Sequence, residues 1–187
     1  MRIHTRIRAA IVAGLLTSLA IGETAAQAPA TSEYQVKAAY LYNFGRFVQW
    51  PAPGAAGEPF TICVLGDDPF GPILDKTLDG AAIGGSAVVA RRIGGPGEAG
   101  SCHILFISTS EAPQLGETLT RLEKTSVLTV SDLPDFVQRG GVIQFVHAGN
   151  RVRFEINLTR AQNAGLVLSS DLLKVAVAVR KTSRSGD

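Results

Sequence analysis

The chain of 187 residues is poor in the residues that build specialised sites. It contains two cysteines, three histidines and one tryptophan. The cysteines and the two histidines that follow residue 26 lie too far apart for a zinc site, and no Cys-x-x-Cys spacing indicates a redox site. The glycine-rich segment at 94–97 is interrupted by Pro96 and does not fit a dinucleotide-binding loop. We therefore expect neither a cofactor nor a metal ion.

An excess of charge of one sign is also lacking. The sequence has 18 basic and 16 acidic residues. Three of the basic and one of the acidic residues lie in the first 26 positions, so the remainder carries 15 of each sign. Nonspecific binding to nucleic acid draws its affinity from neutralised phosphates. The balanced remainder therefore argues against nucleic acid as a partner.

Long hydrophobic runs are absent except near the start, where Ala9–Ile21 spans 13 residues without charge. This is shorter than the roughly 20 residues that cross a bilayer. Three arginines precede the run and the small residues Thr24-Ala25-Ala26 follow it, which is typical of a secretory signal peptide. We predict a signal peptide over residues 1–26 and a mature domain over 27–187, exported to the periplasm in a Gram-negative cell and secreted otherwise.

The two cysteines, Cys63 and Cys102, form an even set in a chain that we expect to reach an oxidising compartment. That setting favours one disulfide bond. Closing a loop of about 40 residues would stabilise the folded state by roughly 4 kcal/mol on the chain-entropy account. Two buried free thiols are the alternative, because unpaired cysteine is commonly buried.

Aromatic residues are few but concentrated, with six of the twelve between Tyr34 and Trp50. Apolar residues recur there at helical spacing, and Pro51 ends the run. The apolar stripe extends well beyond one face. A helix that is apolar nearly all round is buried on two sides or contacts a partner.

The rest of the mature chain alternates apolar runs with helical patterns. We predict buried strands and one hairpin at Phe60–Leu65, Ser86–Arg92, His103–Ile107, Val127–Val130, Val142–Val146 and Val152–Ile156. We predict helices from Pro69 to Leu78, through Leu115–Leu122, around Phe136 and over Asp171–Arg180. This order predicts a single-domain α/β sandwich with a mostly parallel sheet, an edge hairpin and helices on both faces.

Residues of catalytic type occur without the pattern of an enzyme. Ser108 and Ser131 follow strands at positions that helix caps favour, and His103 and His147 stand at strand ends without a partner motif. Two acidic pairs, Asp67/Asp68 and Asp132/Asp135, precede predicted helices, where the helix dipole favours negative charge. A metal at Asp67/Asp68 is the alternative, on weak evidence. We therefore do not expect an enzyme.

Arg151 and Arg153 lie on one face of a predicted strand. Two guanidinium groups on one face can hold an anion or the carboxylates of a partner. A solvated strand face is the alternative, because antiparallel strands often face water on one side. Both readings stay open from the sequence.

Seven motifs occur in order behind the predicted signal peptide, and together they cover nearly all of the mature chain. They are YQVKAAYLYNFGRFVQWP (34–51), FTICVLGDDPFG (60–71), CHILFISTSE (102–111), VLTVSD (127–132), GGVIQFV (140–146), VRFEIN (152–157) and AGLVLSSDLLKVA (164–176). With these motifs the chain resembles the YfiR family of periplasmic regulators.

The resemblance implies a repressor without catalytic activity and with a compact α/β fold that tends to dimerise. Family members of this type bind the periplasmic part of an inner-membrane diguanylate cyclase and keep it inactive, and an outer-membrane lipoprotein can sequester the repressor. Release of the cyclase raises cyclic di-GMP and favours biofilm. Cys63 and Cys102 match one disulfide of the family pattern, whereas a second pair found in some members is missing.

Two functions are therefore expected. In the first, the protein represses by contact, and Tyr42, Phe47 and Trp50 are the candidate partner residues, with burial in the core as the alternative. In the second, it is a periplasmic small-molecule binding module that feeds a sensor. That hypothesis depends on the polar ends of the strands, where open α/β sheets bind ligands, and on Arg151 and Arg153.

Overall fold

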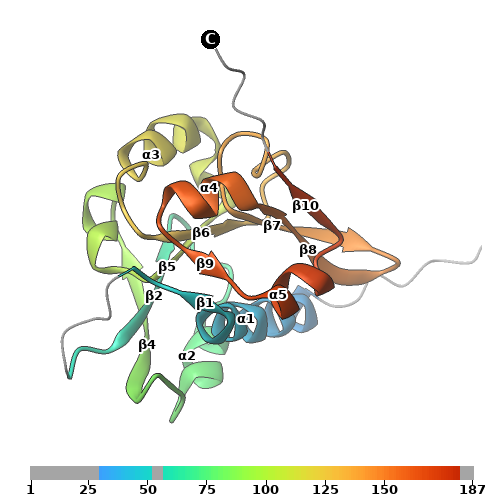
Figure 1. The fold of residues 1–187 in the computed structure, drawn as a ribbon. Helices are drawn as coiled ribbons and strands as arrows, with labels where there is room; N and C mark the ends of the chain where they lie inside the picture. Colours follow the sequence, from blue (N-terminus) through green and yellow to red (C-terminus); the bar gives the residue numbers. More distant parts are fainter. Residues whose placement is uncertain (1–29, 52–56, 182–187) are drawn as a thin grey trace, which may run out of the picture.

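A computed structural model describes residues 30–51 and 57–181 as an α/β domain built on one eight-stranded sheet (Figure 1). The strand order is β10-β8-β7-β6-β5-β2-β4-β3. The predicted signal peptide lies outside the described residues. The strands of this sheet are β2 (Phe60–Leu65), β3 (Ala82–Ile83), β4 (Ser86–Ile93), β5 (Ile104–Ile107), β6 (Leu128–Ser131), β7 (Ile143–Ala148), β8 (Arg151–Asn157) and β10 (Ala178–Arg180).

Most of the sheet is parallel, as the sequence predicts. Strands β4, β2, β5, β6 and β7 run in one direction, and β10 is parallel to β8. The predicted hairpin is present as β7 and β8, which pair Phe145 with Phe154. Gly149 and Asn150 make its turn with φ values of 57° and 58°. The hairpin lies one strand in from the edge, because β10 continues the sheet beyond β8.

Helices cover both faces of the sheet, as predicted. They are α1 (Ala30–Phe47), α2 (Pro72–Leu78), α3 (Leu115–Arg121), α4 (Leu158–Asn163) and α5 (Ser170–Val175), with 3-10 helices η1 (Pro96–Ser101) and η2 (Thr109–Gln114). One hydrophobic cluster joins α1, α2 and α5 to the sheet, and a second joins α3 and η1 to the other face. The alternation along β2 explains this: Ile62 and Val64 belong to the first cluster, Cys63 and Leu65 to the second.

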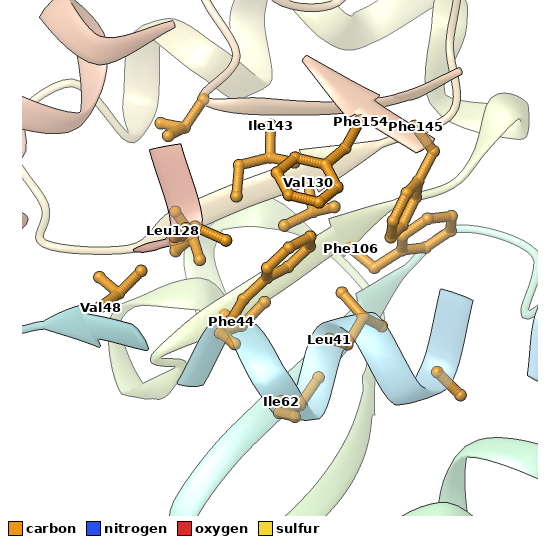
Figure 2. Packing of buried hydrophobic residues seen from close by; sticks show 14 of the residues in the cluster. Leu41, Phe44, Val48, Ile62, Phe106, Leu128, Val130, Ile143, Phe145 and Phe154 are labelled. Atoms are coloured by element: carbon orange, nitrogen blue, oxygen red, sulfur yellow. The ribbon is translucent and has the colours of Figure 1, made fainter. Parts of the chain in front are cut away.

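Helix α1 confirms the prediction of a long, largely apolar helix. Leu41 and Phe44 are fully buried and point from α1 toward the sheet, where Phe44 meets Phe145 and Phe154 (Figure 2). The ring centroids of Phe44 and Phe154 lie 5.1 Å apart in an edge-on contact. Full burial of a side chain of this size stabilises the fold by about 1.5–3 kcal/mol.

The chain that follows α1 adds a small two-stranded sheet that the sequence did not indicate. Strand β1 (Val48–Gln49) pairs antiparallel with β9 (Val167–Leu168), and the amide of Ser169 donates to the carbonyl of Phe47. Two-residue strands are too short for periodicity to indicate them. This pairing fixes the end of α1 to the C-terminal part of the domain.

The predicted helix over Asp171–Arg180 is wrong in its second half. Helix α5 ends at Val175, and the residues that follow form strand β10. The Val177 amide donates to the Phe154 carbonyl beside β8. Alternating valines in AVAVR fit an open sheet edge better than a helix, because β-branched residues favour the pleated surface.

The predicted short helix around Phe136 is also wrong. Residues 134–140 form turns, and Asp135 has a φ of 57°, which a right-handed helix does not allow. The Ser131 hydroxyl accepts a hydrogen bond from the Leu133 amide and donates to the Ile107 carbonyl, which satisfies the backbone without a helix. After Ser108 the chain enters η2 before α3 begins, so this serine does not cap α3 directly.

Candidate functional site

A buried lysine on α1 is surrounded by acidic and hydroxyl side chains. Lys37 on α1 has a side chain only 3% exposed. Its Nζ forms an ion pair with Asp132, which follows β6, at 2.7 Å, and a second with Glu33 one helical turn earlier. The Tyr34 hydroxyl also donates to Oδ2 of Asp132, at 3.1 Å. Two carboxylates thus compensate one buried ammonium group, which an unpaired burial would not allow.

This arrangement shifts the pKa values of two side chains, Tyr34 and Glu33. Burial raises the pKa of the Tyr34 hydroxyl, and the charge of Asp132 raises it further. Burial also tends to raise the pKa of Glu33, but the hydrogen bond and charge of Lys37, together with His147, outweigh it and lower that pKa. Glu33 therefore stays ionised at neutral pH, and Tyr34 stays a hydrogen-bond donor.

The cluster lines an open pocket of about 190 Å³, which we call the Lys37 pocket. Its walls are Glu33, Lys37, Thr109, Asp132, Phe145, Val146 and His147. Thr109 follows the end of β5 and Asp132 the end of β6, and Phe145–His147 belong to β7. These three strands are parallel, so the pocket lies at their carboxyl ends, beside α1. Open α/β sheets bind ligands in this position.

His147 stands at the exposed rim of the pocket. Its side chain is 62% exposed, and its Nε2 lies 3.3 Å from Oε2 of Glu33. The sequence indicated His147 at the end of a strand and Asp132 in an acidic pair before a predicted helix, but it did not indicate Glu33, Tyr34 or Lys37. The Glu33/Lys37 spacing of i, i+4 was the one local signal, and it is common on solvated helices.

Arg151 and Arg153 lie outside the Lys37 pocket. Their strand partners are Ala148 and Val146, and they alternate along β8 with Val152 and Phe154, which pack toward α1. The two arginines therefore face the other side of the sheet. Arg151 is exposed, and Nη2 of Arg153 donates to the Val175 carbonyl at 3.4 Å. Their role in ligand binding stays a prediction.

The three candidate partner residues differ in exposure. Phe47 is 38% exposed at the end of α1. Tyr42 is half-buried, and its hydroxyl donates to the Ala82 carbonyl at 3.3 Å. Trp50 is half-buried, with its ring edge-on to Phe60 at 5.1 Å. Phe47 is therefore the most accessible of the three, and their role in partner binding stays a prediction.

The outer side of α1 carries an apolar groove that the sequence did not single out. It is about 340 Å³ and is lined by Gln35, Val36, Ala39, Tyr40 and Asn43. Val36 is 42% exposed. The groove residues Val36 and Ala39 are exposed, whereas Leu41 and Phe44 are fully buried, so α1 buries one side and presents another.

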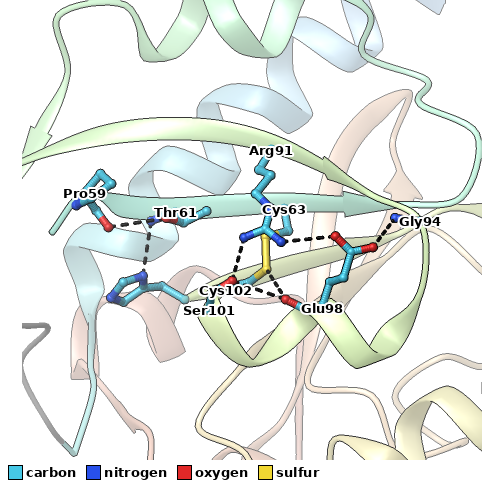
Figure 3. Close-up of a disulfide and its surroundings, with 9 residues drawn as sticks. Pro59, Thr61, Cys63, Arg91, Gly94, Glu98, Ser101 and Cys102 are labelled. Atoms are coloured by element: carbon cyan, nitrogen blue, oxygen red, sulfur yellow. Dashed lines mark hydrogen bonds and ion pairs between the residues drawn. A yellow bond between two sulfur atoms is a disulfide. The ribbon is translucent and has the colours of Figure 1, made fainter.

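The disulfide is formed between Cys63 and Cys102, whose Cα atoms lie 5.8 Å apart (Figure 3). It joins the middle of β2 to Cys102, which directly follows η1 and stands two residues before β5, and both cysteines are buried. Beside it, Arg91 donates to Ser101 and to Glu98, while Glu98 accepts from the Gly94 amide. The bond and these contacts hold the η1 loop against the parallel sheet.

Arg92 is engaged by acidic residues of the α2 region. Its guanidinium donates twice to Asp75 and once to Asp68, and also to the Gly71 carbonyl. Hydrogen bonding from Arg92 lowers the pKa of Asp75 against the opposing effect of burial. Asp68 also accepts from the Phe70 amide, so it stabilises the turn before α2. Asp68 therefore has a structural role in the turn before α2 and in the contact with Arg92.

The serines and histidines do not assemble into a nucleophile and base. No hydrogen bond among the described residues joins a serine hydroxyl to a histidine ring. His103 stacks on Phe60 with centroids 4.3 Å apart, and its Nδ1 accepts from the Thr61 amide. Burial lowers the pKa of His103. In the described part of the chain no three His, Cys, Asp or Glu residues could hold a metal ion, and no described helix is long and apolar enough to cross a membrane.

The sequence assigns this α/β domain to a known family. The sequence profile of the YfiR/HmsC-like family matches residues 34–177. The chain belongs to the YfiR/HmsC-like family. A search of curated proteins finds no match.

Two solved structures share the fold at low sequence identity. One is a conserved domain protein from Vibrio cholerae, with a TM-score of 0.55 and 9% identity. The other is an ABC domain in complex with L-Trp from Streptococcus pneumoniae, with a TM-score of 0.52 and 13% identity. In each case the match covers 79% of this chain and 60% of the other chain, so this chain spans less than two thirds of either. These likenesses bear on the fold alone.

Proposed function

We propose that the protein is an exported periplasmic repressor that contacts the periplasmic part of a membrane diguanylate cyclase and holds it inactive. The observation that carries this proposal is the family match over residues 34–177. In this proposal the protein acts as a homodimer, lowers cyclic di-GMP and biofilm formation, and is itself sequestered by an outer-membrane lipoprotein. It has no catalytic role.

Two structural features support a role in contact with a protein partner. Helix α1 presents Val36 and Phe47 to solvent, and its groove is mostly apolar. Exposed apolar patches often mark protein–protein interaction sites. The Cys63–Cys102 disulfide suits an oxidising compartment. Repression then requires that the protein bind the inactive state of the cyclase more tightly than the active state.

The test in cells compares cyclic di-GMP before and after deletion of the gene. The deletion strain is then restored with the full chain or with a chain that lacks residues 1–26. The proposal expects cyclic di-GMP to rise on deletion and to fall again only with the full chain. An unchanged level, with expression of the protein verified in the parent strain, contradicts repression.

The contact surface has its own test with a matched control. Phe47 and Val89 are each 38% exposed, but Val89 lies on β4 while Phe47 ends α1. Phe47→Glu should relieve repression, and Val89→Glu should leave it intact, with both variants retaining the wild-type circular dichroism spectrum. Full repression by Phe47→Glu would exclude Phe47 from the contact.

A second function, binding of a small ligand, is supported by the Lys37 pocket at the carboxyl ends of β5, β6 and β7. A ligand that binds only the folded state raises the melting temperature with concentration. A thermal-shift screen of amino acids, nucleotides, carboxylates and amines tests this function, and a flat screen contradicts it.

A further inference from the structure

We infer that the Lys37 pocket binds a small organic cation through a primary ammonium group. This inference rests on the second proposed function, ligand binding at this pocket, and it names the class of ligand. It stands apart from the repressor proposal, because it depends on the charges, free acceptor atoms and size of the pocket and not on the partner.

The charge of the pocket favours a cation. Glu33 and Asp132 contribute two carboxylates, and Lys37 contributes one ammonium group that is already paired with both. One negative charge therefore remains uncompensated when His147 is neutral. An anion would have to compete with two carboxylates for Lys37, whereas a cation meets an excess of acceptors. The electrostatic preference for a cation over an anion is larger in a partly buried site than in bulk water, because the effective dielectric constant is lower there.

Acceptor atoms are left over for that cation. The two hydrogen bonds to Asp132, from Tyr34 and Lys37, both go to Oδ2. No hydrogen bond from a described residue goes to Oδ1 of Asp132, so this oxygen can accept one from a ligand. Oε2 of Glu33 contacts only the exposed ring of His147, at 3.3 Å, and a ligand ammonium group can replace that contact. An ammonium group carries three donors, so it can bind both carboxylates at once.

The remaining walls suit a short apolar body. Phe145, which is 3% exposed, contributes an aromatic ring at the pocket wall, and Thr109 contributes a short side chain. The ring of Phe145 lies 5.9 Å from Nζ of Lys37, within the range of a cation–π contact, so the ring already has a cation beside it. A cavity of about 150 Å³ accommodates benzene. The pocket, at about 190 Å³, therefore has room for about six to eight non-hydrogen atoms.

The first experiment is calorimetric titration of the mature protein with three compounds of matched length. Putrescine carries two ammonium groups, 1,4-butanediol carries none, and succinate carries two carboxylates. We expect saturable binding of putrescine at least tenfold tighter than that of the diol and no binding of succinate. Tighter binding of succinate or the diol overturns the cation class while ligand binding stands. Binding of none of the three, together with a flat thermal-shift screen, overturns both.

The second experiment places the binding in the pocket. Glu33→Gln removes one carboxylate from the pocket, and Glu117→Gln removes one from the surface of α3, where it pairs with Arg121. His147→Lys adds a charge at the exposed rim, and Thr120→Lys adds one on α3. Both pocket variants should weaken putrescine binding about tenfold or more, and both α3 variants less than twofold. Equal weakening by pocket and α3 variants would assign the binding to overall charge and overturn the site.

Discussion

Lys37 on the first helix and Asp132 after the sixth strand stand 95 positions apart in the sequence and form an ion pair with a 2.7 Å separation. The pair joins α1 to the carboxyl end of the sheet and forms one wall of the Lys37 pocket. Because the side chain of Lys37 is almost fully buried, its charge depends on its acidic partners.

Removal of Asp132 should therefore destabilise the fold. Asp132→Ala leaves Lys37 buried with Glu33 as its remaining carboxylate partner, and we expect the free energy of unfolding to fall by about 3 kcal/mol. Urea denaturation at pH 7 measures the loss. The double variant Lys37→Met, Asp132→Leu should recover part of it, because no charge is then left buried. Equal stability of Asp132→Ala and wild type would show that water reaches Lys37.

Loss of the disulfide should lower stability without changing the fold. The bond closes a loop with a sequence separation of 39, and replacing both cysteines by alanine should lower the free energy of unfolding by about 2–5 kcal/mol. Thermal melts with and without reductant measure the effect. Reductant should lower the melting temperature of the wild type and leave that of the double variant unchanged.

His103 should make stability depend on pH. Burial holds its pKa in the folded state below the usual value of about 6.5, which the unfolded chain retains. As the pH falls through about 6.5, the unfolded state binds a proton that the folded state does not. The free energy of unfolding therefore decreases from pH 7.5 toward pH 5.5.

Chemical denaturation across that range in two variants assigns the effect. His103→Gln should lose most of the decrease, because it has no imidazole to protonate in the unfolded chain. His147→Gln should retain the contribution of His103. An identical pH dependence of wild type and His103→Gln would contradict the assignment.

The geometry of the Arg92 guanidinium group should contribute more to the stability of the fold than its positive charge does. Arg92→Lys keeps one positive charge but loses the paired hydrogen bonds to Asp75 and the bond to Asp68, so we expect a loss of about 1 kcal/mol. Arg121→Lys, in an exposed i, i+4 pair with Glu117, is the matched control and should cost less than about 0.5 kcal/mol. Equal losses in the two variants would mean that water already weakens the Arg92 contacts.

The sequence was sufficient to predict the strands, helices and turns that depend on a local pattern of residues. Continuous apolar runs such as Phe60–Leu65 became central strands, and the Gly149–Asn150 turn became the hairpin. The valines of the predicted helix Asp171–Arg180 were assigned wrongly in part. Their sequence is compatible with a helix, but in the fold the last of them pair with β8 as strand β10. The pairing of β1 with β9 joins residues about 120 positions apart and leaves no periodic trace.

The candidate site was less accessible from the sequence than the fold. His147 was predicted at the end of a strand and Asp132 before a helix, whereas Lys37 looks in the sequence like an ordinary polar position on an aromatic helix. Its burial arises only when α1 packs across the ends of β6 and β7. The role of Lys37 becomes visible only from its ion-pair partner Asp132, which lies 95 positions away in the chain.

The packing of α1 has a consequence for the order in which the protein is assembled. Helix α1 precedes the eight-stranded sheet in the chain, but the rings that cover Phe44 belong to β7 and β8. The hydroxyl of Tyr40 likewise donates a hydrogen bond to the carbonyl of Val152, which lies 112 positions later in the chain. A nascent chain thus carries the exposed aromatic side of α1 until nearly all of the domain has been synthesised. Contacts of such long range slow folding, and apolar surface that stays exposed until the final strands pair favours aggregation.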